Sequence, residues 1–193
     1  LRRHGQLDNT LIVFCSDNGG CAEFLREDGE VGKWPEIYSL PTKTGTRCVV
    51  GNHRGRHPGG AETFMSYELP WANASNTPFR KFKAWTHEGG ISTPLVASWP
   101  AGLTAGAIRH GTGHLVDLVA TACTLAGADT AELDGQSLAP VWRGEVGEVS
   151  RPEPLCWEHY GHAAIRQGQW KLVRAGAQAP WELYDISTDR IEQ

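Results

Sequence analysis

Residues 11–15 form an unbroken apolar run that stops at a cluster of small polar residues, Ser16 to Gly20. A run without polar alternation is typical of a strand buried on both faces in the middle of an α/β sheet. The glycines at its end allow a tight turn. Residues 95–99 form a second such run, ended by Pro100, and predict another buried strand.

A helical period appears over residues 114–126, where apolar side chains recur every three or four positions. Gly127 follows directly and is typical of a helix C-cap. Shorter helices are predicted over residues 62–71 and 137–142, the second of which Gly144 would end. With the two apolar runs, these helices predict an α/β domain over residues 1–150.

Beyond Pro154 the pattern changes to short alternating stretches with many aromatic residues, separated by glycine-bearing turns. This pattern predicts an antiparallel sheet of about four strands. The strands are expected over residues 155–160, 163–166, 170–174 and 181–185. We therefore expect residues 151–193 to begin a small β subdomain.

Residues 21–61 are a long irregular section, or insertion, rich in glycine, proline and charge. Loops of this length are uncommon unless they are functional or disordered. A section that rises from a ligand-binding edge would suit a gate over a substrate. A surface loop with no specific contacts explains the same composition, and both interpretations stay open.

The composition is ordinary for a globular protein, with 40% hydrophobic and 21% charged residues. The net charge is −4 and no run of like charges occurs, so nothing favours nucleic acid or an anionic membrane as a partner. No apolar segment approaches the roughly 20 residues that a membrane span needs.

Asp17 and Asn18 are the first candidates for chemistry, because they follow the first predicted strand directly. In open α/β sheets the carboxyl edge of the strands is where ligands bind. A carboxylate beside an amide carbonyl suits Ca²⁺ or Mg²⁺. Asp-Asn-Gly is also an ordinary turn sequence, so the pair alone leaves a metal site and a simple turn both open. His114 and Asp117, three residues apart, likewise fit either a metal pair or a polar helix start.

A second stretch, residues 76–100, changes this balance. Together the two stretches resemble the C-terminal half of the catalytic domain of the sulfatase family, in its type I, formylglycine-dependent, arylsulfatase-like branch of the alkaline phosphatase superfamily. The motifs that carry the resemblance occur in the order Ser-Asp-Asn-Gly-Gly (16–20), Asn-Thr-Pro-Phe-Arg (76–80), Lys-x-x-x-x-Glu-Gly-Gly-Ile-x-Thr-Pro (83–94) and Trp-Pro-Ala-Gly (99–102).

The resemblance implies the C-terminal part of an alkaline-phosphatase-like α/β sandwich, followed by a small antiparallel sheet with a packed helix. It implies a Ca²⁺ ion (alternatively Mg²⁺), with Asp17 and Asn18 as half of its ligands. It places a sulfate-contacting catalytic lysine five residues before the Glu of Glu-Gly-Gly, which is Lys83. Without the resemblance, a solvated basic run would explain residues 80–83.

The nucleophile that the resemblance implies is absent from the sequence. Formylglycine is made from Cys or Ser in a Cys/Ser-x-Pro-x-Arg motif, and no such motif occurs here. The family's first strand, with its paired aspartate ligands, is missing as well. We therefore expect a fragment whose N-terminal half lies elsewhere, and we expect this chain alone to be inactive.

Three functions remain in competition. The first is an arylsulfatase-like sulfuric ester hydrolase that cleaves a small sulfate ester or a sulfated glycan. The second is a phosphonate monoester or phosphodiester hydrolase of the same superfamily. The third is a non-catalytic paralogue that binds sulfated ligands. The family resemblance favours a periplasmic or secreted protein, whereas the oligomeric state is not indicated by the sequence.

Overall fold

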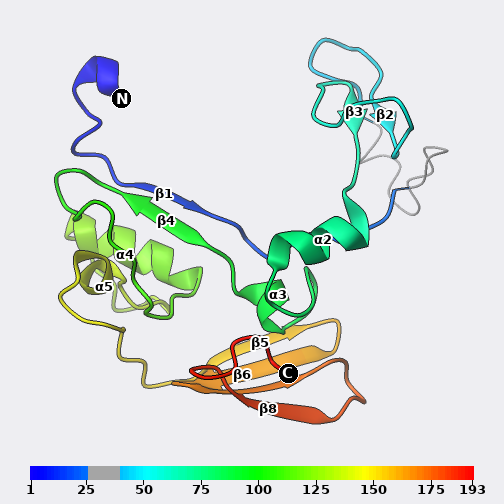
Figure 1. Cartoon of the computed structure of the whole chain (residues 1–193). Helices are drawn as coiled ribbons and strands as arrows, with labels where there is room; N and C mark the ends of the chain where they lie inside the picture. Colours follow the sequence, from blue (N-terminus) through cyan, green and yellow to red (C-terminus); the bar gives the residue numbers. More distant parts are fainter. Residues whose placement is uncertain (26–39) are drawn as a thin grey trace. The chain divides into compact units, whose positions relative to one another are not determined.

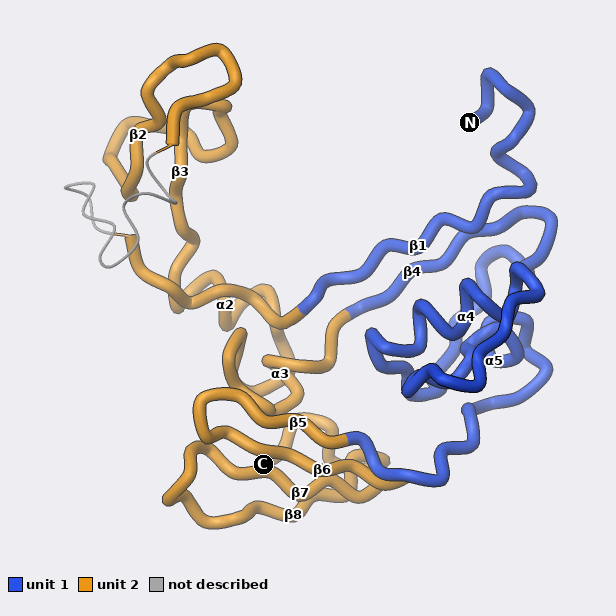
Figure 2. Tube along the Cα trace, turned by 180° about the vertical axis from the view of Figure 1, so that it is seen from behind, with its two compact units in different colours: residues 1–17, 94–155 blue, residues 18–93, 156–193 orange. Residues whose placement is uncertain are grey.

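The structure is a computed structural model, and it describes residues 1–25 and 40–193. The chain divides into two compact units, residues 1–17 with 94–155 and residues 18–93 with 156–193 (Figure 2). Each unit combines segments that are far apart in the sequence. The long section predicted over residues 21–61 lies in the second unit, and its residues 26–39 fall outside the described part of the chain.

The first unit consists of a two-stranded antiparallel ribbon and two helices, with a short 3-10 turn near the N-terminus (Figure 1). Strand β1 runs antiparallel to β4, with Phe14 directly opposite Val96. The elements are η1 (Arg2–His4), β1 (Ile12–Cys15), β4 (Leu95–Ser98), α4 (Val116–Ala126) and α5 (Ala139–Arg143). Helix α4 begins two residues later than predicted and ends at Gly127, which takes the left-handed conformation at φ 70°. Gly144 ends α5 in the same way, at φ 77°.

The prediction that residues 11–15 and 95–99 are strands buried on both faces is wrong. Phe14 is 70% exposed and Val96 is 60% exposed. Among the described residues, β1 and β4 pair only with each other. The unbroken apolar runs therefore form strands, as predicted, but within residues 1–25 and 40–193 no layer covers the face that carries these two side chains.

The second unit contains the small sheet predicted near the C-terminus. Its four strands lie side by side in the order β5-β6-β7-β8, and both β6–β7 and β7–β8 are antiparallel. They are β5 (Leu155–His159), which begins at the last residue of the first unit, β6 (His162–Gln167), β7 (Trp170–Arg174) and β8 (Trp181–Asp185). Ala164 and Val173 face each other in register and are both buried, so they form part of the core of this unit.

The other elements of the second unit precede this sheet in the sequence. They are β2 (Val49–Val50), β3 (Thr63–Phe64), α2 (Glu68–Asn76) and α3 (Glu88–Ile91). The helix predicted over residues 62–71 therefore begins later, because Thr63 and Phe64 pair with β2 in a short parallel ladder. It ends at Asn76, since Thr77 precedes a proline and takes an extended backbone. None of the helices in the described residues is long and apolar enough to cross a bilayer.

Candidate active site

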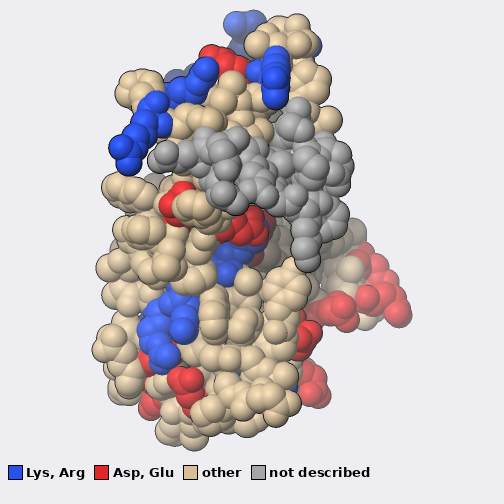
Figure 3. All heavy atoms as spheres, turned by 90° about the vertical axis from the view of Figure 1, so that its right-hand side faces the viewer, with Lys and Arg blue, Asp and Glu red and all other residues tan. Residues whose placement is uncertain are grey.

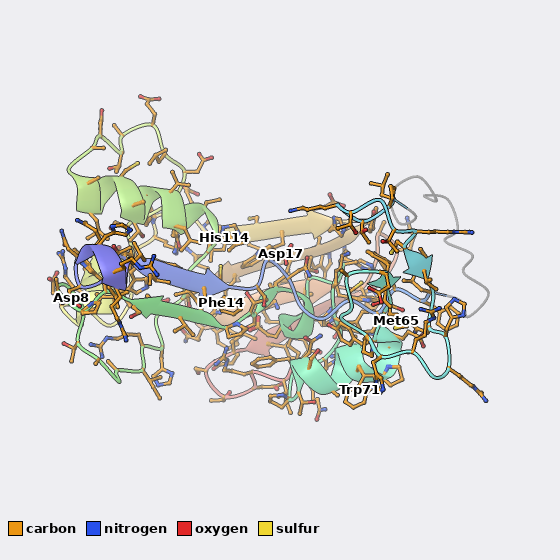
Figure 4. The ribbon with its side chains drawn as sticks, turned by 90° about the horizontal axis from the view of Figure 1, so that it is seen from above. Asp8, Phe14, Asp17, Met65, Trp71 and His114 are labelled. Carbon is orange, nitrogen blue, oxygen red and sulfur yellow. The ribbon has the colours of Figure 1, made fainter. Side chains whose placement is uncertain are left out.

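Asp17 and Asn18 follow β1 directly, as the sequence predicts. Asp17 is exposed and lies just past the end of the strand (Figure 4). Asn18 is half-buried, and its side-chain Nδ2 donates a hydrogen bond of 2.8 Å to the carbonyl of Gly19. This bond directs the amide oxygen of Asn18 away from that carbonyl. Asp17 is the last residue of the N-terminal segment of the first unit, and Asn18 is the first residue of the second unit.

The turn after Asn18 packs directly against the Glu-Gly-Gly segment. The backbone N–H of Gly19 donates to the carbonyl of Gly90 at 2.9 Å. A Cβ built on Gly19 would lie 1.8 Å from the carbonyl oxygen of Gly89, and one built on Gly89 would lie 2.1 Å from that of Arg80. Since real Cβ atoms do not approach so closely, only glycine fits these positions. These glycines therefore let the two backbone segments pass close to each other.

Hydrogen bonds around Asn76 and Gly20 join three of the sequence motifs. Its Oδ1 accepts from the backbone N–H of Gly20 at 2.9 Å, and its Nδ2 donates to the carbonyl of Lys81 at 3.0 Å. The backbone N–H of Lys83 donates to the carbonyl of Gly20 at 2.9 Å. This bond places Lys83 beside Gly20, which follows Asn18 by two residues, although 65 positions separate Asn18 and Lys83 in the sequence.

The ammonium group of Lys83 lies beside acidic and sulfur groups of the same turn. Its Nζ is 3.2 Å from Oε1 of Glu23 and 3.9 Å from Sγ of Cys21. The Lys83 side chain is 40% exposed and that of Glu23 is 63% exposed. An ion pair so open to water contributes at most about 1 kcal/mol, so it exchanges readily for another anion.

The backbone on either side of Lys83 is unusual. Lys81 has φ 69° and Ala84 has φ 80°, both in the left-handed region that side chains other than glycine rarely adopt. Such a conformation costs roughly 1–3 kcal/mol per residue and persists only where surrounding contacts enforce it. The segment that carries Lys83 is therefore held by its neighbours in a shape that it would not take alone.

The donor set of Asp17 and Asn18 fits a partial site for a hard cation. One carboxylate and one amide oxygen are donors that Ca²⁺ and Mg²⁺ accept, but Ca²⁺ takes six to eight oxygen ligands. Within residues 1–25 and 40–193, no group of three or more His, Cys, Asp or Glu side chains is arranged to hold a metal. Asp17 and Asn18 alone are therefore too few to complete the shell of such an ion.

Asp117 has a structural role at the start of α4. Its Oδ2 accepts from the backbone N–H of His114 at 2.6 Å, and its Oδ1 accepts from that of Gln136 at 2.9 Å. Both oxygens also pair with the guanidinium of Arg151. Although burial acts to raise it, these partners lower the pKa of the Asp117 carboxyl. The polar helix start accounts for His114 and Asp117 without a metal.

A buried ion cluster lies between the Glu-Gly-Gly segment and the four-stranded sheet. Lys171 of β7 is fully buried, and its Nζ lies 2.8 Å from Oε1 of Glu88 and 2.7 Å from Oε1 of Glu192. The other carboxylate oxygen of Glu192 accepts the backbone N–H of Glu88 at 2.8 Å. Burial raises the pKa of Glu192, while Lys171 acts to lower it.

Arg80 makes a second link to the same sheet. Its Nη1 donates to Oε2 of Glu182 at 3.2 Å and to the hydroxyl of Tyr184 at 3.0 Å, and it also contacts the carbonyl of Glu192. Burial acts to lower the pKa of Arg80, but the hydrogen bonds to Tyr184 and Glu182 raise it overall. The guanidinium is therefore a permanent cation in this cluster.

His87 lies inside this cluster and is fully buried. Burial lowers the pKa of His87 to about 4, and the positive charges of Arg80, Lys171 and Lys81 act in the same direction against Glu182. Its Nε2 is 3.8 Å from the carboxylate of Glu182. The imidazole is thus neutral at pH 7.

The sequence reasoning missed Lys171, Glu192 and Tyr184. One signal was present in β7, where Lys171 and the buried Val173 occupy alternate positions and so face the same side. A lysine on the buried face of a strand requires a carboxylate partner. The pattern could therefore have predicted an ion pair, although not which acid would form it.

Comparison with protein families gives a match to the family model described as "Sulfatase", over residues 1–128. An uncharacterized sulfatase of Schizosaccharomyces pombe is 27% identical across all of this chain, which covers 35% of that protein. The N-acetylgalactosamine-6-sulfatase of Rattus norvegicus is 38% identical over 62% of this chain and 23% of its own length. The chain thus spans about a third or less of these relatives.

A solved structure from work on the metabolism of multiple glycosaminoglycans by Bacteroides thetaiotaomicron matches all of this chain and 36% of its own, with a TM-score of 0.62. The two sequences are 19% identical, so this likeness concerns the fold. It extends beyond the residues that the family model matches and includes the four-stranded sheet.

Proposed function

The chain belongs to the sulfatase family, and we propose that it is the C-terminal portion of a sulfuric ester hydrolase that cleaves sulfate monoesters. The observation that carries this proposal is the backbone hydrogen bond between Lys83 and Gly20, which brings the two family motifs together. The share of the relatives' length that the chain covers supports a portion of a larger enzyme, with the nucleophile supplied by the remainder.

In this proposal Lys83 binds the sulfate group. A sulfate monoester carries its negative charge on the sulfuryl oxygens, and charge increases on the leaving oxygen as the S–O bond breaks. A fixed ammonium group stabilises that charge more in the transition state than in the ground state. The exposed carboxylate of Glu23, which pairs with Lys83 in the structure, would give way to a sulfate oxygen.

Asp17 and Asn18 would hold part of the shell of a Ca²⁺ ion, or alternatively Mg²⁺. When bound, such an ion supplies Lewis-acid stabilisation of the sulfuryl oxygens. Asp17 would be the charged ligand and Asn18 the neutral one. The bond from Asn18 to the Gly19 carbonyl supports this role, because it fixes the orientation of the amide.

A sulfated sugar is the substrate class that we favour. The rat relative is named for N-acetylgalactosamine 6-sulfate, and it is 38% identical to this chain over the matched residues. The net charge of −4 favours no particular partner, and the face seen in Figure 3 carries both basic and acidic side chains. Discrimination among sulfate esters would therefore depend on local contacts around Lys83.

The direct test is the Lys83→Ala variant of the complete enzyme that contains this chain. With 4-nitrophenyl sulfate as substrate, we expect kcat/KM to fall about 100-fold or more. Lys81→Ala is the matched control, because it removes a cation two residues away and should change kcat/KM less than about threefold. Equal effects of the two variants would overturn the role of Lys83.

The same enzyme separates the competing functions. Sulfatase activity requires faster turnover of 4-nitrophenyl sulfate than of bis(4-nitrophenyl) phosphate, and the reverse order would favour a phosphodiesterase. A Cys/Ser-x-Pro-x-Arg motif upstream in the coding sequence would exclude the non-catalytic paralogue. N-acetylgalactosamine 6-sulfate tests the preferred substrate class.

A further inference from the structure

We infer that the four-stranded sheet positions the proposed sulfate-binding lysine, and that Lys171 and Arg80 are positioning residues for Lys83. This inference rests on the proposed function, because Lys83 matters only if it binds the substrate. The sheet would then contribute to catalysis through the conformation of a segment that it contacts, without touching the substrate. All of the residues involved belong to the second unit.

One anchor of the segment that carries Lys83 lies at Glu88. Lys171 on β7 places one ammonium between Glu88 and Glu192, at 2.8 Å and 2.7 Å. All three side chains are buried, so water does not screen the pairs, and removal of one partner would leave an uncompensated buried charge. Glu192 also accepts the N–H of Glu88, which fixes the first residue of α3.

A second anchor lies at Arg80, at the other end of the segment. Its guanidinium donates to Glu182 and Tyr184 of β8. Arg80 precedes Lys83 by three residues, and Glu88 follows it by five. The segment that carries Lys83 is thus fastened to neighbouring strands of one sheet, β7 and β8, on both sides of the proposed catalytic residue.

The backbone between the two anchors has an unusual conformation. Lys81 and Ala84, on either side of Lys83, both have positive φ angles. A segment with two such residues would relax towards ordinary conformations if its ends were released. The anchors therefore do more than stabilise the fold. They keep Lys83 in the position in which its backbone N–H donates to the carbonyl of Gly20.

A purely structural role for the ion cluster makes a different prediction. If Lys171 only stabilised the fold, the folded fraction of a Lys171→Met variant would turn over substrate as the wild type does. If Lys171 acts through Lys83, Lys171→Met would lower kcat/KM, and this loss would disappear in the Lys83→Ala background. A double-mutant cycle distinguishes these cases, since residues that act through one another are not additive.

The cycle is measured in the complete enzyme with 4-nitrophenyl sulfate, well below the melting temperature of every variant. We expect Lys171→Met to lower kcat/KM roughly 10- to 50-fold when Lys83 is present, and less than about twofold in the Lys83→Ala background. Val173→Ala is the matched control: it removes packing from the same buried face of β7, and should lower the melting temperature while it leaves kcat/KM within about twofold.

Tyr184→Phe provides a second route if Lys171→Met does not fold. It removes only a hydroxyl from the Arg80 anchor, and we expect a several-fold loss of kcat/KM that also vanishes in the Lys83→Ala background. Wild-type kcat/KM in a folded anchor variant, or an equal loss in both backgrounds, would overturn the inference. If Lys83→Ala itself has no effect, the proposed function fails instead, and the two failures are distinguishable.

Discussion

Lys83 depends on residues that have no functional groups of their own. Gly19, Gly89 and Gly90 let three stretches of backbone approach at distances that a single methyl group would prevent. Their contribution is steric, because a side chain at any of them would meet a carbonyl oxygen of the next stretch. At the residue scale, the candidate site is thus fixed by the absence of side chains as much as by Asn18 and Lys83.

The first prediction concerns Gly89. A Cβ at this position would lie 2.1 Å from the carbonyl oxygen of Arg80 and 2.3 Å from that of Lys81. We expect Gly89→Ala to lower the free energy of unfolding by about 3 kcal/mol or more, because backbone atoms must move to relieve the overlap. Gly60→Ala is the control, as its nearest contacts are at 3.6 Å or beyond. Chemical denaturation of both variants checks this, and equal stabilities would contradict it.

The second prediction concerns the pH dependence of stability. Burial lowers the pKa of His87 to about 4, against about 6.5 in the unfolded chain. The unfolded state therefore binds a proton first as the pH falls, so His87 should cost stability progressively between about pH 6.5 and pH 4, and up to roughly 3 kcal/mol in all. Of the groups that face His87, Arg80 has a raised pKa and Glu182 a lowered one, so both keep their charges over most of this range.

Replacement of His87 by a group that does not titrate tests this account. The His87→Gln variant should show a flatter stability profile than the wild type between pH 6.5 and pH 4, measured by urea denaturation at each pH. Its stability at pH 7 is expected to be lower, because the packing around the imidazole is lost. A profile of unchanged slope would show that another group dominates the acid dependence.

At the scale of elements, the sequence predicted best what local signals determine. Helices α4 and α5 end at Gly127 and Gly144, as expected, because a left-handed glycine after a periodic run is a local signal. The four C-terminal strands also lie within one or two residues of their predicted bounds. The helix predicted over residues 62–71 begins only at Glu68, since Thr63 and Phe64 pair instead with residues 49–50, which no local pattern indicates.

The third prediction concerns the role of Asp117 in stabilising the start of α4. This fully buried carboxylate joins the start of α4 to Gln136 and Arg151. Asp117→Asn leaves Arg151 without its charge partner, so we expect a loss of about 3 kcal/mol or more in the free energy of unfolding. Glu148→Gln, at an exposed position of the same unit, should change it by less than about 0.5 kcal/mol. Thermal unfolding compares them, and similar midpoints would contradict the role of Asp117.

At the scale of the whole molecule, burial could not be predicted from the sequence. The apolar run at residues 11–15 indicates a strand covered on both faces, whereas Phe14 and Val96 are exposed on one face of the β1–β4 ribbon. An apolar run indicates that a strand is covered in the folded protein. It does not indicate which residues cover that strand. The expectation that Asn18 and Lys83 serve one site came from the family resemblance, not from any local pattern.

The fourth prediction follows from this exposed face. Phe14→Ser should lower the free energy of unfolding of this chain alone by less than about 0.5 kcal/mol, because the side chain is 70% exposed. In the complete enzyme we expect a loss of about 3 kcal/mol, since the remainder of the protein would bury the ring. Val173→Ala, in the four-stranded sheet, should cost the same in both contexts. An equal, small effect of Phe14→Ser in both would show that the face stays uncovered.

The central claim is that Asp17, Asn18 and Lys83 serve one site that takes a divalent cation and a sulfate ester. Its most direct test is the calcium concentration that gives half-maximal hydrolysis of 4-nitrophenyl sulfate by the complete enzyme, in Asp17→Asn and in the matched control Asp8→Asn. We predict a rise of about 100-fold or more for Asp17→Asn and no change for Asp8→Asn, whose side chain lies before β1. A calcium requirement unchanged by Asp17→Asn would contradict the account.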